Sequence, residues 1–277
     1  MPLYFSISGY LFWYTKRNNN RTFIEFIKDK TKRLLVPFVI CGLLWMLPIK
    51  KMIHYAGYEN VKVTQIIVKK IFWGGDNGHL WFLEALFVVF LIMYFFSYND
   101  CKAYNEQGKK YLKHISKWIL LIIMSLYAYK LNRIPVLKNA TQYMIWFYTG
   151  FLIHAYEEGI TKYKKIFSIV GGLLSFVGIG LYLANCNGIL RYIVSLIIVV
   201  TLYSVMPQKS SRLIQRLERD SYGIYLFHSP LIYITCTYLL NESPLLVFGV
   251  NFFVWGTLAV IMTELLRKTK LRFVIGE

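Results

Sequence analysis

The hydrophobic positions of this chain fall into long runs separated by short polar stretches. Lipid offers no partner for open backbone groups, so we expect every run to be a helix. The pattern predicts an all-α membrane helix bundle that forms a single domain over residues 1–277, with nine spans, the first of them partial. The runs fall at 1–13, 34–49, 79–97, 117–131, 140–156, 166–184, 189–206, 221–240 and 244–266.

The first apolar run is too short for a complete span. About 14 apolar residues reach about 21 Å, whereas the hydrocarbon core is about 30 Å thick. A secretory signal carries its positive charges before the apolar stretch, but here they follow it, from Lys16 to Arg33. We therefore expect a partial membrane helix and a missing N-terminal piece.

Composition agrees with a polytopic membrane protein. Hydrophobic residues make up 56% of the chain and aromatic residues 18%, more apolar surface than a soluble chain of 277 residues can bury. The net charge of +18 would suggest nucleic-acid binding in a soluble protein. Here the charges lie in short loops between apolar runs, so the positive-inside rule explains them better and no nucleic-acid partner is expected. The four cysteines have no metal or redox spacing, which predicts no metal site.

The basic residues also predict an orientation. Loops 14–33, 98–117, 157–165, 207–219 and 267–277 together hold 23 of the 32 lysines and arginines, and the alternate loops hold 9. The first set is expected in the cytoplasm, with the C-terminus. This places Met1 outside, so one further helix ahead of Met1, giving ten spans, is expected.

Four motifs now resemble one family. Residues 2–12 (PLYFSISGYLF) resemble the second helix of the membrane acyltransferase 3 family, and residues 30–37 (KTKRLLVP) its basic cytoplasmic motif. Residues 78–86 (GHLWFLEAL) and 221–230 (SYGIYLFHSP) resemble two later signatures, and the four occur in family order.

The resemblance implies a ten-helix enzyme of the cell (plasma or inner) membrane. Such enzymes move an acyl group, usually acetyl or succinyl, from cytoplasmic acyl-coenzyme A to a saccharide hydroxyl on or beyond the outer face, without a metal. Exopolysaccharide or lipid-linked sugar is the implied acceptor, with membrane lipid and polysaccharide-synthesis proteins as possible partners. The family's first helix carries a basic residue and a histidine that would lie ahead of Met1, so the chain as given is expected to be weak or inactive. A small-molecule transporter and a non-catalytic remnant stay open as alternatives.

His79 and Glu84 are the first catalytic candidates. His79 at the outer end of its helix, beside Trp81, is either an interfacial anchor or a base for a sugar hydroxyl, and the resemblance favours the base. Glu84 lies about 7.5 Å deeper and about 140° around the helix, so the two residues are not assumed to form a dyad. The alternative for Glu84 is a buried acid satisfied by an Arg or Tyr of another helix.

Ser221, Tyr225 and His228 follow at i, i+4 and i+7 and share one helical stripe. We expect Ser221 and Tyr225, together with Trp81, to contact substrate and His228 to take part in catalysis. The alternative is hydrogen bonding between helices, which also applies to the weaker pair Thr257 and Glu264.

Lys30 and Arg33 share a face before the second run, and the resemblance favours them as ligands of coenzyme A phosphates. Without it they would be topogenic charges. The turn 73–78 and the outer residues His54 and Arg191 are weaker candidates for the sugar site, and His154 is an interfacial or core residue.

Overall fold

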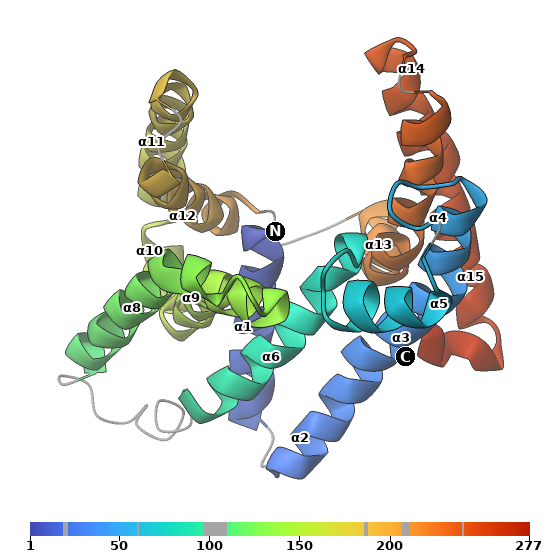
Figure 1. Ribbon diagram of the computed structural model, residues 1–277. Helices are drawn as coiled ribbons and strands as arrows, with labels where there is room; N and C mark the ends of the chain where they lie inside the picture. Colours follow the sequence, from blue (N-terminus) through green and yellow to red (C-terminus); the bar gives the residue numbers. More distant parts are fainter. Residues whose placement is uncertain (19–21, 60, 97–109, 186–187, 207–210, 240) are drawn as a thin grey trace. The chain divides into compact units, whose positions relative to one another are not determined.

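A computed structural model describes residues 1–277 except 19–21, 60, 97–109, 186–187, 207–210 and 240 (Figure 1). The described part is mostly helical and contains no strand, which confirms the predicted all-α class. Parts of the predicted basic loops 98–117 and 207–219 lie outside the described residues, as do Cys101 and Cys186.

Within the described residues, each predicted apolar run lies mostly in helix. The helices are α1 (Pro2–Asn18), α2 (Phe23–Lys30) with η1 (Thr31–Leu35), α3 (Val36–Ile40), η2 (Cys41–Met46) and α4 (Leu47–Met52), α6 (Trp81–Phe96), α8 (Lys110–Tyr127), α9 (Pro135–Ala155), α10 (Glu157–Lys162), α11 (Lys164–Asn185), α12 (Gly188–Val205), α13 (Arg212–Tyr238), and α14 (Pro244–Gly249) with η7 (Val250–Trp255) and α15 (Gly256–Arg267).

Four of these helical stretches are long and apolar enough to cross a membrane: Phe23–Met52, Gly78–Phe96, Lys164–Ala184 and Pro244–Arg267. The helix Leu190–Val205 is apolar but shorter. The predicted count of nine spans is therefore not confirmed, although a membrane protein is supported.

The predicted loop 50–78 is wrong over part of its length. Residues 63–72 form a short helix, α5 (Val63–Gln65) continued by η3 (Ile66–Phe72). Ile66 and Ile71 are fully buried on it, while Lys69 is exposed and Lys70 is half-buried. A segment this short, with two lysines, is too polar for an apolar window, so only its tertiary packing makes it helical.

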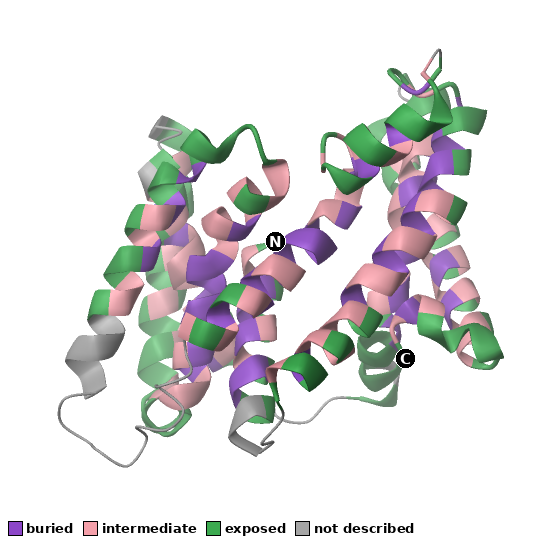
Figure 2. Cartoon of the chain, turned by 60° about the horizontal axis from the view of Figure 1, so that its bottom comes forward, coloured by how far each residue is buried: buried purple, intermediate pink, exposed green. Residues whose placement is uncertain are grey.

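The described chain divides into two compact units. Unit 1 holds Met1–Arg21, Ile92–Lys130 and Ala140–Lys209, and unit 2 holds Thr22–Leu91, Leu131–Asn139 and Ser210–Glu277. Buried and exposed positions follow one another along most helices (Figure 2), as expected of helices that pack on one face.

In unit 1, α1 crosses α9 with the two backbones in contact. A Cβ atom on Gly9 would lie 1.9 Å from the carbonyl oxygen of Phe147, and one on Gly150 would lie 1.8 Å from that of Ser6. Only glycine fits at either position, which is the close approach that small residues permit between membrane helices. Gly9 belongs to the first motif, so its role there is to let α1 approach α9.

Glycine also permits close contact between α11 and α12, which lie side by side (Figure 1). A Cβ on Gly171 would meet the Thr201 hydroxyl at 2.2 Å, and one on Gly178 would meet Val194 at 2.7 Å. The other faces of α11 leave large apolar side chains such as Leu173 and Phe176 exposed, as suits a helix that faces lipid.

In unit 2, two π-helical turns interrupt the stretch Phe23–Met52, each just before a proline. Pro37 has no N–H to donate to the carbonyl of Arg33, four residues earlier. That carbonyl instead accepts a hydrogen bond of 2.7 Å from the Tyr222 hydroxyl. The basic motif is thus joined to α13.

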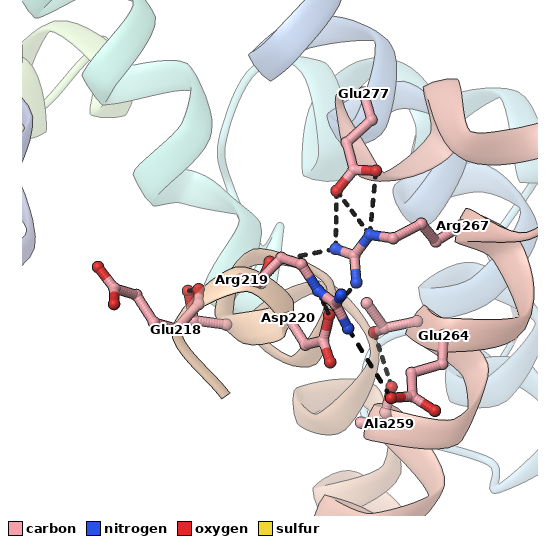
Figure 3. Close-up of polar contacts among 9 residues, drawn as sticks. Glu218, Arg219, Asp220, Ala259, Glu264, Arg267 and Glu277 are labelled. Atoms are coloured by element: carbon pink, nitrogen blue, oxygen red, sulfur yellow. Dashed lines mark hydrogen bonds and ion pairs between the residues drawn. The ribbon is translucent and has the colours of Figure 1, made fainter. Parts of the chain in front are cut away.

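α13 and α15 also lie side by side, with Gly223 facing Thr263. At one end of the pair Arg267 bonds the carboxylate of Asp220, and its Nε and Nη2 atoms bond Glu277 at 2.7–3.0 Å (Figure 3). Arg219 contacts Asp220 at 3.2 Å and Glu264 at 3.9 Å. We call these five residues the Arg267 network. It satisfies Asp220, which is 1% exposed.

Candidate active site

His79 lies in the one-turn 3-10 helix η4 (Gly78–Leu80) that leads into α6. Gly78 precedes it with φ +55°, and a Cβ there would lie 2.7 Å from the Tyr233 hydroxyl, so the turn requires glycine. Both ring nitrogens of His79 are inaccessible and neither has a hydrogen bond of normal geometry within the described structure. A buried imidazole in this state is available to a group that enters the site.

Two residues of α13 surround the His79 ring. Its centroid lies 5.2 Å from that of Tyr225 and 6.3 Å from that of His228, and the latter two are 6.4 Å apart. The Tyr225 hydroxyl donates to the backbone carbonyl of His79. We call these three residues the histidine cluster. Two motifs far apart in the sequence are therefore brought together.

The hydrogen bond of His228 fixes its tautomer. Its Nδ1 atom lies 2.7 Å from the carbonyl oxygen of Ile224, one turn earlier on α13. A carbonyl oxygen only accepts, so Nδ1 carries the proton. In the neutral ring Nε2 is then unprotonated and can accept a proton.

Pro230 explains why the backbone of α13 is open beside this cluster. Proline has no N–H for the carbonyl of Leu226, four residues earlier. The backbone of Leu226 lies close enough to interact with the His79 ring, although not at normal hydrogen-bond geometry. The next carbonyl, of Phe227, accepts from Trp45 Nε1 at 3.2 Å. The proline of the fourth motif therefore exposes a backbone acceptor to the histidine.

Of the predicted stripe on α13, only two members reach the cluster. Ser221 is exposed, and its hydroxyl donates to the carbonyl of Glu218 at 2.7 Å, on its own helix. Trp81, at the start of α6, packs edge-on against Phe82 with ring centroids 6.4 Å apart.

Glu84 is buried, at 7% exposure, and accepts a hydrogen bond from Asn77 Nδ2. Asn77 is itself 2% exposed. The sequence suggested an Arg or Tyr of another helix as the alternative partner; the partner is instead a neighbour seven residues earlier, in the turn before His79. This bond ties the Gly-rich turn to α6.

Lys50 is a buried residue that sequence reasoning missed. It is 0% exposed, and its Nζ atom donates to Asp76 Oδ1 at 3.0 Å and to the Tyr58 hydroxyl at 3.3 Å. The Tyr58 hydroxyl donates to the backbone carbonyl of Asp76 at 2.7 Å. Burial, together with the Asp76 carboxylate, raises the pKa of Tyr58, so this phenol stays a neutral donor.

The two predicted donor-binding residues, Lys30 and Arg33, contact different partners. The Lys30 ammonium lies 4.1 Å from the centroid of the Phe90 ring, whereas Arg33 pairs with Asp29 at 3.0 Å. The Arg33 side chain is 60% exposed, so its pairing with Asp29 is a weak surface contact that a stronger anion can replace.

The remaining candidates lie apart from the cluster in sequence and contacts. His54 is exposed, 3.5 Å from Glu59. In unit 1, the His154 Nδ1 atom is 2.9 Å from Glu157, and Arg191 is exposed on α12. Glu264 belongs to the Arg267 network, and Thr257 has no described polar contact that assigns it a role. Within the described residues no group of three or more His, Cys, Asp or Glu side chains is placed to hold a metal ion.

Comparison with known proteins supplies the family. No curated protein and no solved structure matches the chain. A family model described as an acyltransferase domain matches residues 1–265, which includes the four motifs and the histidine cluster. The chain therefore belongs to the acyltransferase 3 family of membrane proteins.

Proposed function

We propose that the protein is a membrane O-acyltransferase that moves an acetyl or succinyl group from acyl-coenzyme A to a hydroxyl of an extracytoplasmic or lipid-linked saccharide. The observation that carries the proposal is the histidine cluster, in which His228 has Nδ1 protonated toward Ile224 and Nε2 left to accept a proton. An acyl transfer to a hydroxyl needs such a base.

In this scheme Nε2 of His228 takes the proton of the acceptor hydroxyl as its oxygen attacks the thioester carbonyl. The C–S bond then breaks, and the coenzyme A thiolate leaves with the proton returned from the imidazolium. His79 holds the acceptor through a ring nitrogen, since neither nitrogen has a hydrogen bond of normal geometry, or exchanges roles with His228. Glu84 supports the turn through Asn77 rather than touching the acceptor.

The donor is proposed to bind from the cytoplasmic side at the basic motif. Arg33 would exchange its surface pair with Asp29 for a phosphate oxygen of coenzyme A, with Lys30 adding a second positive charge. Arg33→Ala is expected to weaken coenzyme A binding by about 1.5–3 kcal/mol, and Arg33→Lys to restore part of it. Arg212→Ala, another exposed arginine, is the control.

The function is tested by label transfer. Membranes containing the protein receive acetyl-coenzyme A or succinyl-coenzyme A labelled in the acyl group, and label is counted in the lipid-linked saccharide fraction. His228→Gln keeps hydrogen bonding but is a poor base, so transfer is expected to fall about 10²–10⁴-fold. The matched control is His54→Gln, at an exposed histidine outside the cluster.

The same assay separates the two histidines. If His79→Gln retains full transfer while His228→Gln does not, His79 has only a positional part and His228 is the base. Full transfer in both variants would contradict the proposed site. Uptake of label into vesicles without transfer to saccharide would favour a transporter instead.

A further inference from the structure

We propose that Lys50 is the positioning residue for His79: its buried ammonium fixes the turn that places the imidazole against α13. The inference rests on the proposed function, because it assumes that His79 faces the acceptor. Lys50 itself does not touch the reacting atoms in this account.

The surroundings of Lys50 are those of a cation-binding cage. Its ammonium lies 4.8 Å from the centroid of Tyr55 and 4.6 Å from those of Tyr58 and Tyr233. The Asp76 carboxylate completes the shell at 3.0 Å. Three aromatic faces and one carboxylate compensate for the lost water of a fully buried charge. We call these three tyrosines the Lys50 cage.

Lys50 and its cage, together with Glu84, hold the residues that directly precede His79. Lys50 binds the side chain of Asp76, and Tyr58 binds the backbone carbonyl of the same residue at 2.7 Å. Asn77 is bonded to Glu84, and Gly78 lies directly against the Tyr233 hydroxyl. All three residues that precede His79 are therefore fixed by contacts to α4, α6 or α13.

The third tyrosine connects the cage to the proposed base. Tyr233 is on α13, five residues after His228 and eight after Tyr225. The same helix thus presents Tyr233 to Lys50 and the two cluster residues to His79. Charge on Lys50 draws the turn toward the same helix that carries the base, which sets how close His79 and His228 lie.

Lys70 offers a contrast. Its ammonium lies 4.2 Å from the Tyr58 ring centroid and donates to the carbonyl of Gly57. The Lys70 ammonium makes no described contact with residues 76–78. The Lys70 carbonyl accepts from the Asp76 N–H at 3.0 Å, and Lys70→Met keeps this backbone bond, so loss of the Lys70 charge leaves the turn before His79 tied. A cation beside the Tyr58 ring is therefore not enough to hold the turn. The geometry assigns the positioning role to buried Lys50.

The test measures the exposure of His79 with diethyl pyrocarbonate, which modifies accessible neutral imidazole nitrogens, in the full chain in detergent. Mass spectrometry reads each histidine separately. In the wild type, exposed His54 reacts fast and His79 slowly. Lys50→Met keeps the side-chain length and removes the charge. It is expected to raise the His79 rate about tenfold or more, the change expected when local opening loses a charge-assisted hydrogen bond, with His154 unchanged. Lys70→Met and Lys51→Met should leave His79 protected, and Lys50→Arg should restore part of the protection.

A rise at His154 as well would indicate general unfolding of Lys50→Met. Tyr58→Phe then replaces it, because that variant keeps the Lys50 charge and its pair with Asp76. It loses only the bonds of the Tyr58 hydroxyl to the Asp76 carbonyl and to Lys50 Nζ, and is expected to give a smaller rise confined to His79. If His79 stays as protected as in the wild type in a folded variant, the inference is wrong.

Labelled acetyl-coenzyme A supplies the second readout. A positioning role predicts that Lys50→Met lowers kcat and leaves KM for acetyl-coenzyme A unchanged, and that Lys50→Arg recovers part of kcat. Equal kcat in wild type and Lys50→Met would overturn it. If His79 loses protection as expected but the wild type transfers no label, the positioning of His79 stands and the proposed acyl transfer fails.

Discussion

The hydroxyl of Tyr222 donates a hydrogen bond to the backbone carbonyl oxygen of Arg33 at 2.7 Å. Gly276 packs against the same residue: a Cβ on this glycine, whose φ is +74°, would lie 3.0 Å from that oxygen. The backbone of the basic motif is therefore enclosed by α13 and by the final turn of η8 (Lys270–Ile275), while the Arg33 side chain points to a partner on its own helix.

Tyr222→Phe is expected to destabilise unit 2 by about 0.5–1.5 kcal/mol, because the Arg33 carbonyl, which Pro37 cannot satisfy, loses its donor. The midpoint of thermal unfolding in detergent measures the change. Tyr238→Phe, at an exposed tyrosine on the same helix, is the control and should leave the midpoint unchanged. Equal midpoints for both variants would mean that another donor replaces the hydroxyl.

Asp76→Asn is expected to destabilise the protein more than Lys50→Met. The first change leaves a buried ammonium without its counter-charge, at a cost of about 3–5 kcal/mol, whereas the second leaves a carboxylate that water reaches. The double variant should therefore be more stable than Asp76→Asn alone. Chemical unfolding of the three variants in one detergent checks the order, and a double variant less stable than Asp76→Asn would contradict the buried pair.

Gly150→Ala is expected to destabilise unit 1 by about 1–3 kcal/mol, since its methyl group would overlap the Ser6 carbonyl and force α1 away from α9. Gly172→Ala is the matched control, because nothing lies within 4 Å of its added methyl. There the better helix propensity of alanine should stabilise by up to about 1 kcal/mol. Differential scanning fluorimetry measures both, and the effects should have opposite signs.

The predicted orientation places α10 in the cytoplasm and residues 61–62 outside. In a cysteine-free background, Lys62→Cys should react with an impermeant maleimide in intact cells. Glu158→Cys, on α10, should react only after the membrane is permeabilised. Rapid labelling of Glu158→Cys in intact cells would invert the topology that the 23 to 9 division of basic residues predicts.

The sequence predicted where most of the helices lie, whereas its count of nine spans is not confirmed. Apolar runs locate helices because a backbone surrounded by lipid must satisfy its hydrogen bonds within the segment, which a helix does. The span count depends on length and polarity together. For example, α13 carries Arg216, Glu218 and Arg219 in its first turns, and this lowers its average hydropathy. The helix 63–72 was missed because packing of Ile66 and Ile71, rather than composition, makes it helical.

At the site, the motifs predicted that His79, Tyr225 and His228 matter, and the structure brings these residues together. Their roles remain the proposal above. Asn77 was predicted only as part of the turn 73–78, a weaker candidate for the sugar site, and its bond to Glu84 was not foreseen. Lys50 was missed because, at the end of an apolar run, it resembled a loop charge. Residues that pair only through tertiary contacts have no regular spacing in the sequence, so a sequence pattern does not reveal them.

The Arg267 network shows why the number of basic residues that orients a chain during insertion differs from the net charge of the folded surface. Insertion into the membrane responds to lysine and arginine in the nascent loops and is little affected by acids. The folded surface, in contrast, presents net charge to anionic lipid. Arg219 and Arg267 contribute to the first quantity, but Asp220, Glu264 and Glu277 neutralise them once the chain folds. On this edge of unit 2 the attraction to lipid headgroups is therefore left to Lys268, Lys270 and Arg272, and the two arginines that help to orient the chain are afterwards used to hold α13 and α15 together.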